Sequence, residues 1–293
     1  MAQTSFSTSR SHLLHAVVRA KHPCTYVHGC TVFRFCRSKN RSRKTTIFRN
    51  TLFQVLSRIG IIAALPAEAK CLYSKKIKAG LPIEIQQDVF LCLSGIGHES
   101  ALFAAKKLTA LKVDALISWG VAGAIDKSVN SGDIILANAI INEGNRYSTS
   151  EDWLSRVSEH LQATCMVTNG DIASSKEICA STMDKFHLSQ KTGALAVDME
   201  SAAIAETATA NNLDLLVIRT ISDDADTAIP EAVLKHTNNL GQPRIFNFML
   251  SCILKPNQIR EISSLASGYK KGLTSLSEIA QVLNDRHFLY SDS

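Results

Sequence analysis

Three short apolar stretches of the sequence each run into acidic residues. The stretches and the acids that follow them are residues 59–65 with Glu68, residues 195–197 with Asp198 and Glu200, and residues 215–218 with Asp223. Apolar runs without polar alternation are typical of strands that are covered on both faces of a sheet. Ligands of open α/β sheets bind just outside the carboxyl ends of such strands. The pattern therefore restricts the chain to an α/β fold with several carboxylates at one rim of the sheet.

Strand-like and helix-like segments alternate along the rest of the chain. We expect further strands at residues 83–85, 89–93, 115–119, 133–141 and 165–167, and helices at residues 98–108, 150–161, 174–186, 201–210, 231–236, 243–254 and 273–283. The many small residues of 201–210 would allow that helix to pack closely on a sheet. Acids in a first helical turn are common, so Asp198 and Glu200 could also serve only to start this helix.

The first 57 residues differ from the rest in charge. Residues 1–58 contain 11 Lys and Arg and no Asp or Glu, whereas the remaining 235 contain 21 basic and 26 acidic residues. The basic balance of the whole chain is therefore no sign of nucleic acid binding by the remainder. We expect residues 1–57 to be a disordered extension and residues 58–293 to form the domain. The extension could be a transit-like presequence, an arm for nucleic acid or anionic lipid, or an over-extended gene start, which we favour.

The sequence offers no ordinary metal or membrane-spanning motif. No stretch reaches the roughly 18 consecutive apolar residues that a spanning helix needs. The eight cysteines form no Cys-x-x-Cys pair and no zinc-spaced cluster with histidine. We therefore expect no metal, and scattered cysteines in apolar surroundings indicate a reduced, cytoplasmic protein.

Three motifs occur in order along the chain. Glu68 follows the first strand, Asp198-Met199-Glu200 is followed by alanines, and an Arg-x-x-Ser-Asp-x-Ala-Asp motif spans residues 219–226. In this order they resemble the nucleoside phosphorylase superfamily, and within it the nucleosidases that cleave methylthioadenosine and S-adenosylhomocysteine. Residues 193–200, 241–243 and 254–258 further resemble the hopanoid-associated phosphorylases. The resemblance implies a single domain with a mixed, partly barrel-like central sheet flanked by helices.

The resemblance implies that an acid faces the leaving base. Breaking the bond between a purine and ribose passes through an oxocarbenium-like sugar, so the base needs a proton as it leaves. Asp223 would supply that proton, with Asp224 and Asp226 as neighbours whose negative charge favours its protonated form. Asp226 could instead be structural, paired with Arg219.

The other acids would serve the sugar and the nucleophile. By resemblance, Glu200 would hold the ribose hydroxyls, where an ionised carboxylate gains strength as the sugar becomes positive. Met199 would pack on the sugar, and Asp198 is a further candidate substrate contact. Glu68 would activate the attacking water.

Two further segments are candidate ligand contacts. Ser94-Gly95-Ile96-Gly97 forms a strand-to-helix turn whose backbone N–H groups, if free, could bind phosphate or ribose oxygens, although a plain packing turn fits equally well. By resemblance, Ala173 stands where the nucleosidases have an aromatic residue that stacks on the base. Ser174 would contact the base through its backbone.

The substrate stays open at this point. The hopanoid resemblance favours adenosylhopane, cleaved to adenine and a ribosyl or phosphoribosyl hopane, and apolar residues within 246–253 could line a channel for it. A lipid substrate would also bring the protein to a membrane surface. The runner-up is a methylthioadenosine/S-adenosylhomocysteine nucleosidase, and a nucleoside-binding protein without catalysis is an alternative of another class.

The nucleophile stays open as well. Phosphorolysis would need inorganic phosphate as a co-substrate, and phosphorylases hold it with several arginines. Residues 59–171 contain only Arg146 and Arg156, which favours hydrolysis, whereas the hopanoid resemblance favours phosphorolysis. We expect no other cofactor and no nucleic acid partner, and the resemblance implies a homo-oligomer.

Overall fold

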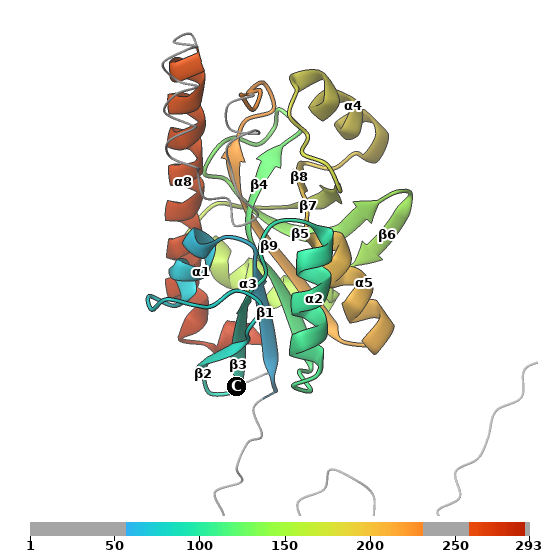
Figure 1. Cartoon of the computed structure of the whole chain (residues 1–293), viewed down its shortest axis with the longest axis vertical. Helices are drawn as coiled ribbons and strands as arrows, with labels where there is room; N and C mark the ends of the chain where they lie inside the picture. Colours follow the sequence, from blue (N-terminus) through green and yellow to red (C-terminus); the bar gives the residue numbers. More distant parts are fainter. Residues whose placement is uncertain (1–56, 231–257, 291–293) are drawn as a thin grey trace, which may run out of the picture. The chain divides into compact units, whose positions relative to one another are not determined.

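The strands of the computed structural model, which describes residues 57–230 and 258–290, form one mixed sheet (Figure 1). They are β1 (Ile59–Ala63), β2 (Ile83–Gln86), β3 (Val89–Leu93), β4 (Ala115–Ala124), β5 (Ile134–Asn142), β6 (Asn145–Ser148), β7 (Val167–Ser174), β8 (Ala196–Asp198) and β9 (Asp214–Asp223). The order along the sheet is β2-β3-β1-β4-β8-β7-β5-β6, and β9 pairs with both β4 and β5. Strands β4, β8, β7, β5 and β9 therefore close into a barrel, from which β1, β3 and β2 extend. The predicted mixed, partly barrel-like sheet is confirmed.

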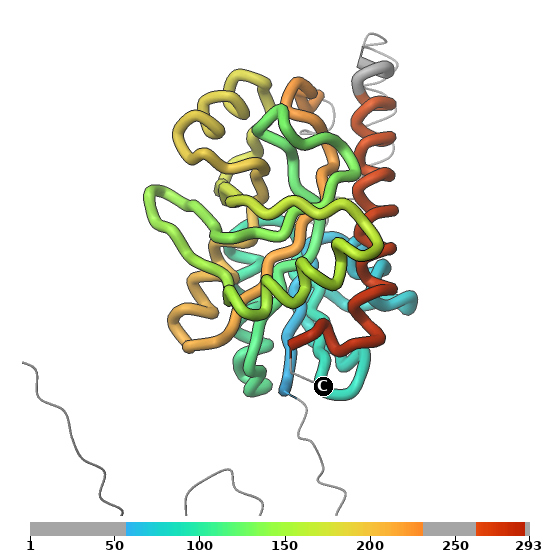
Figure 2. The backbone as a smooth tube through the Cα atoms, turned by 180° about the vertical axis from the view of Figure 1, so that it is seen from behind, coloured from blue at the N-terminus to red at the C-terminus, as the bar shows by residue number. Residues whose placement is uncertain are grey.

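Helices cover this sheet on several sides. They are α1 (Pro66–Leu72), α2 (His98–Thr109), α3 (Glu151–Gln162), α4 (Thr182–Thr192), α5 (Ser201–Asn211), α8 (Gln258–Asn284) and the short 3-10 helix η1 (His287–Leu289). Helices α2 and α5 pack side by side on the near face in Figure 1, and α3 crosses the opposite face in Figure 2. The long helix α8 runs along one edge and packs against β9 and α1.

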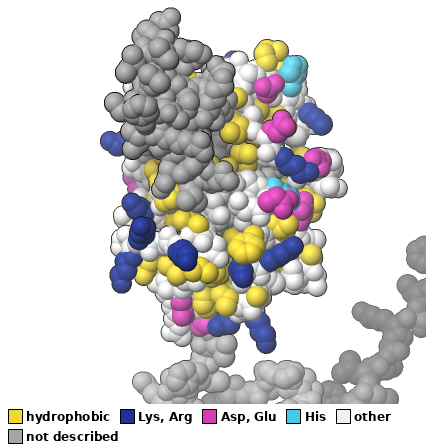
Figure 3. All heavy atoms as spheres, in the orientation of Figure 1, with side chains coloured by type: hydrophobic (Ala, Val, Ile, Leu, Met, Phe, Trp, Pro, Cys, Tyr) yellow, Lys and Arg dark blue, Asp and Glu magenta, His cyan; other side chains and the backbone are white. Residues whose placement is uncertain are grey.

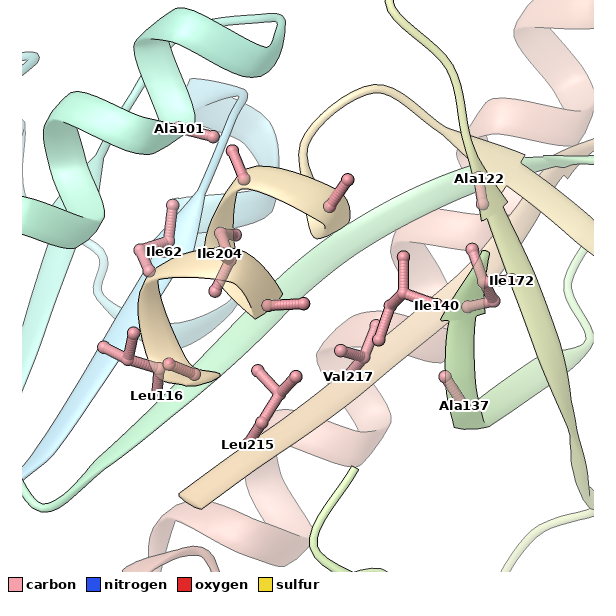
Figure 4. Close-up of a cluster of buried hydrophobic side chains, with 14 of the residues drawn as sticks. Ile62, Ala101, Leu116, Ala122, Ala137, Ile140, Ile172, Ile204, Leu215 and Val217 are labelled. Carbon is pink, nitrogen blue, oxygen red and sulfur yellow. The ribbon is translucent and has the colours of Figure 1, made fainter. Parts of the chain in front are cut away.

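Two large apolar clusters hold the layers together. One lies between helices α2 and α5 and the sheet, where Ile62, Leu116, Ile204 and Val217 meet (Figure 4). The alanines of α5 keep this helix close to the strands, because they have no long side chain to separate the two layers. The other cluster lies on the side of α1, α3 and α8 and includes Trp119. Strands β1 and β9 run parallel to β4, whereas the short strand β8 runs antiparallel to it and pairs with its last two residues.

The helix predicted over residues 174–186 is wrong at its beginning. Strand β7 continues to Ser174, which pairs with Asp198 of β8, so this residue is held in extended backbone. Helix α4 begins only after Ser181, whose hydroxyl accepts a hydrogen bond from the Asp184 amide at 3.0 Å. It ends at Gly193, which adopts the left-handed conformation that favours glycine.

Other predicted elements are longer than expected or outside the description. The strand predicted at 115–119 continues to residue 124, and the closing helix predicted at 273–283 lies within α8. The predicted helices at 231–236 and 243–254, the apolar residues of 246–253, the segments 241–243 and 254–257, and nearly all of the basic extension lie outside the described residues. Within 57–230 and 258–290, no helix has both the length and the apolar character needed to cross a membrane.

Candidate active site

Glu68, in the first turn of α1, is held by two backbone N–H groups, one from the turn after β1 and one from β4. Its carboxylate accepts hydrogen bonds from the backbone N–H of Leu65 at 2.8 Å and of Val121 at 2.9 Å. A side chain at Gly120 of β4 would reach within 2.5 Å of Glu68 Oε1, so glycine leaves the space that the carboxylate fills. Burial raises the pKa of Glu68, although the two backbone donors oppose this effect. Glu68 is therefore a preorganised carboxylate with an increased tendency to take up a proton.

Glu200 lies at the start of α5, across from the turn that precedes α2. Its Oε1 accepts a hydrogen bond from the Gly97 N–H at 2.7 Å. Desolvation of this half-buried carboxylate, followed by the charge of Asp198, raises the pKa of Glu200 to about 7. Glu68 adds a smaller effect of the same sign, which shows that the two glutamates lie within electrostatic range of each other.

Three of the four backbone N–H groups in the turn at residues 94–97 donate to acceptors within the protein, which favours the packing turn of the two interpretations. The N–H of Ser94 donates to the Ala63 carbonyl at 2.9 Å, and that of Gly95 donates to the Ala64 carbonyl at 3.1 Å. Gly97, at φ +95°, gives its N–H to Glu200. For these three residues the expectation of an open phosphate cradle is wrong, because protein acceptors already take the donors.

Asp198 lies beneath the site in a buried polar network. Its carboxylate accepts a hydrogen bond from Arg219 Nε at 2.9 Å and lies 2.8 Å from Arg219 Nη2. It also accepts hydrogen bonds from the N–H of Ser201, at 3.1 Å, and from the Ser201 hydroxyl. Arg219 donates in addition to the hydroxyls of Ser118 and Ser201. The structure thus places Asp198 under the rim, where it positions the start of α5.

The suggested pairing of Asp226 with Arg219 is wrong. Arg219 is buried against Asp198, whereas Asp226 lies beyond the end of β9 and forms an exposed ion pair with Lys127 at 3.0 Å. The side chain of Arg219 instead contacts Asp198 of β8 and Ser118 of β4.

Asp223, the last residue of β9, is buried and lies beside a cation. Its Oδ2 accepts a hydrogen bond from Lys185 Nζ of α4 at 2.5 Å, and its Oδ1 accepts one from the Ser222 hydroxyl at 2.6 Å. Gly123 of β4 makes room for the carboxylate, because a side chain there would lie 3.0 Å from Oδ2. Asp224 instead turns its carboxylate to the N–H and hydroxyl of Ser131. The charged side chain in contact with Asp223 is therefore Lys185, whereas the sequence suggested that the negative charges of Asp224 and Asp226 would set its environment.

The remaining candidates occupy different depths. Met199 is partly exposed beside Glu200. The side chain of Ala173 is 1% exposed and packs with Ile125 and Val197, so it offers no surface to a base. The Ser174 hydroxyl accepts a hydrogen bond from the Ala202 N–H at 3.2 Å. These contacts join β7 to β8 and α5 behind the carboxylates.

Two residues that sequence reasoning missed belong to this rim. Lys185 carries no local signal, because a single lysine in a polar helix looks like a surface residue. Tyr269 of α8 lies near Glu68: burial first, and then the charge of Glu68, raise the pKa of this phenol. In the part of the chain that the structure describes, no three His, Cys, Asp or Glu side chains are grouped to hold a metal ion. A cavity lined by Ser150, Asp214 and Tyr290 lies at the start of β9, away from these carboxylates.

The sequence matches one described protein family. The profile of the phosphorylase superfamily matches residues 58–253. A relative from Staphylococcus aureus (strain JH9), named 5′-methylthioadenosine/S-adenosylhomocysteine nucleosidase, is 26% identical over 198 residues. The match covers 57% of this chain and 87% of the relative.

Solved structures share the fold. The futalosine hydrolase of Helicobacter pylori strain 26695 superposes with a TM-score of 0.58 at 18% identity, covering 78% of this chain and 98% of that one. A 5′-methylthioadenosine/S-adenosylhomocysteine nucleosidase from S. pneumoniae, solved with a transition-state inhibitor, superposes with a TM-score of 0.54 at 22% identity. That match covers 77% of this chain and 99% of the other. At these identities the similarity establishes the fold.

Proposed function

Because the chain belongs to the phosphorylase superfamily, we propose that it hydrolyses the N-glycosidic bond of a 5′-substituted adenosine such as methylthioadenosine. The family and the curated relative identify the chain as a nucleoside-cleaving enzyme. The proposal concerns the substrate and the use of water as the nucleophile. It also assigns the attacking water to Glu68, the ribose to Glu200 and the base to Asp223.

The observation that carries the proposal is the setting of Glu68. A general base that activates water must be held in place and must take up a proton readily near neutral pH. Burial raises the pKa of Glu68, and two backbone N–H groups fix its orientation. Glu200 lies within electrostatic range, so a ribose held by Glu200 would lie near a water held by Glu68. This arrangement supports attack by water on the sugar.

Four of the described arginines support the same nucleophile, because each has a partner within the protein. Arg219 is committed to Asp198, and Arg146 to Asp171 at the surface. Arg58 and Arg156 donate to backbone carbonyls elsewhere. In the turn at 94–97, the N–H groups of Ser94, Gly95 and Gly97 also donate to protein acceptors. Among the described residues, these groups form no cradle for inorganic phosphate.

Methylthioadenosine and adenosylhopane are the two candidate substrates. The curated relative is named for methylthioadenosine and S-adenosylhomocysteine. Of the three segments that favoured adenosylhopane, 193–200 is described, whereas 241–243 and nearly all of 254–258 lie outside the described part of the chain. We therefore propose the soluble nucleoside and keep adenosylhopane as the alternative in the test.

The test measures adenine release by the full chain from methylthioadenosine, S-adenosylhomocysteine and adenosylhopane, each with and without phosphate. We expect phosphate-independent release from methylthioadenosine. Release from adenosylhopane only in the presence of phosphate would replace the proposal with a hopanoid phosphorylase and would remove Glu68 as water activator. Binding of methylthioadenosine without release from any substrate would identify a nucleoside-binding protein without catalysis.

The pH dependence of the reaction should follow Glu200. If its ionised form holds the ribose hydroxyls, kcat/KM should rise by about 10-fold per pH unit below the pKa of about 7 and level off above it. Glu200→Gln should lower kcat/KM at pH 8 by about 10²-fold and remove this limb, because a neutral amide gains less as the sugar becomes positive. Initial rates of adenine release between pH 5 and pH 8, at roughly one-unit steps, measure both effects.

Stability should change in the opposite direction. The folded-state pKa of Glu200, about 7, lies above its ordinary value of 4.5. Its contribution to stability is therefore fully present below pH 4.5 and is lost as the pH rises through about 7.

Glu206→Gln, on the same helix, is the matched control for the pH dependence of kcat/KM and should keep the parental pH profile. A Glu200→Gln profile with the parental limb would assign the limb to another group.

Several expectations stay predictions. They are the homo-oligomeric state, the cytoplasmic location, contact with a membrane surface, and the division into residues 1–57 and 58–293. The proposal for the reaction depends on none of them.

A further inference from the structure

Lys185 is a charged side chain enclosed in the protein. It is 1% exposed, and Nζ donates three hydrogen bonds: to Asp223 Oδ2 at 2.5 Å and to the carbonyls of Asp224 and Thr227 at 2.9 Å each. These bonds use all three ammonium hydrogens. Lysine is almost never fully buried unless it is paired, and here the pair includes the carboxylate assigned to the leaving base.

Helix α4 buries polar side chains and exposes apolar ones, which is the reverse of an ordinary surface helix. Its buried residues are Lys185 and Ser189, whereas the apolar side chains of Met183 and Phe186 are 59% and 52% exposed. Figure 3 shows hydrophobic and histidine side chains on the surface over α4. An apolar side chain in place of a buried ion pair often gives equal or greater stability. Packing alone therefore does not account for a lysine at this position, which suggests a role in the reaction.

An aspartate in an ordinary environment carries no proton at neutral pH. A general acid for the leaving base must nevertheless hold one at the start of each turnover. Asp224 and Asp226, the neighbours that could favour the protonated form, are turned towards Ser131 and Lys127. Of the two side chains described as donors to Asp223, the Ser222 hydroxyl is a very weak acid, so the ammonium of Lys185 is the one that can give up a proton.

We propose that Lys185 positions Asp223 and supplies the proton that Asp223 passes to the leaving base. This inference rests on the proposed function. A proton moves from Lys185 Nζ to the Asp223 carboxylate, which gives a neutral amine and a carboxylic acid. The acid then protonates the purine as the bond from C1′ to the base breaks and its electron pair stays with the base. Water adds to the sugar and loses a proton through Glu68 to solvent, and the Lys185 amine regains a proton from solvent.

Two substitutions separate supply of the proton from placement of the charge. Lys185→Met removes both. Lys185→Arg keeps a cation beside Asp223, but a guanidinium is not deprotonated in proteins and cannot give up its proton. We expect both variants to lose about 10²-fold or more in kcat for methylthioadenosine. Lys191→Met, at an exposed position on the same helix, is the matched control and should keep parental kcat.

The readout is the dependence on the leaving group. A 4-nitrophenyl riboside with the same 5′ substituent releases a phenolate that needs no proton, so both Lys185 variants should cleave it at near-parental rates. In an Asp223→Asn background, Lys185→Arg should cause no further loss. Parental kcat for Lys185→Arg on methylthioadenosine, equal losses on both substrates, or an additive loss in that background would overturn the proposal. A parental enzyme that releases no adenine from any nucleoside would instead overturn the proposed function, and this inference with it.

Discussion

Replacement of Asp223 by asparagine is expected to lower kcat for adenine release by about 10²–10⁴-fold, the usual contribution of a positioned general acid. An amide cannot donate the proton that the leaving base needs. The amide oxygen can still accept the hydrogen bond that Lys185 Nζ gives to Oδ2 at 2.5 Å. The fold should therefore survive, and the loss should appear in kcat more than in KM. Steady-state release of adenine from methylthioadenosine measures it.

Asp224→Asn is the matched control for this prediction. Its carboxylate belongs to the same turn but accepts hydrogen bonds from Ser131, and Lys185 contacts only its backbone carbonyl. The control should change kcat by no more than a few-fold. If Asp223→Asn keeps parental kcat, the base leaves without an acid at this position. That result would contradict the proposed catalytic role of Asp223.

The strands at the rim could be predicted because their signals are local. A continuous apolar run followed by an acid fixes both a buried strand and the end at which its carboxylate lies. Glu68, Glu200 and Asp223 accordingly lie just beyond the carboxyl ends of β1 and β8 and at that of β9. Strand β7 was predicted only at its first residue, because the strand expected at 165–167 stops before Asn169, Gly170 and Asp171. They lie in a strand because Asn169 and Gly170 pair with β5, and that contact is distant in sequence.

The partners of the charged residues could not be predicted. Arg219 and Asp226 share one motif, yet Arg219 pairs with Asp198, 21 residues before it. Lys185 reaches Asp223 across 38 residues, from a helix whose beginning the sequence placed wrongly. The sequence indicates which residues are charged, but the closed barrel decides which of them meet. The charged neighbours of each candidate acid could therefore be identified only from the structure.

Loss of the buried Arg219 guanidinium should have the largest effect on the free energy of unfolding. Arg219 is 3% exposed and donates to Asp198, Ser118 and Ser201, which join β9 to β8, β4 and α5. Arg219→Met would leave Asp198 as an unpaired buried charge, which typically costs about 3–5 kcal/mol. At about 2–4 °C per kcal/mol for a domain of this size, the melting temperature should fall by roughly 6–20 °C. Thermal unfolding followed by circular dichroism measures the change.

Lys127→Met is the matched control, because it also breaks one lysine- or arginine-to-aspartate pair. The side chains of Lys127 and Asp226 are 76% and 72% exposed, so their separation should cost less than about 1 kcal/mol. The double variant Arg219→Met/Asp198→Asn should regain much of the lost stability, because no unpaired charge is left buried.

The charge of Arg219 also lowers the pKa of Glu200, so its removal should move the rising limb of the kcat/KM pH profile above pH 7. A melting temperature within about 2 °C of the parent would place the stability of this rim in its apolar contacts, and an unmoved limb would separate Arg219 from the sugar site.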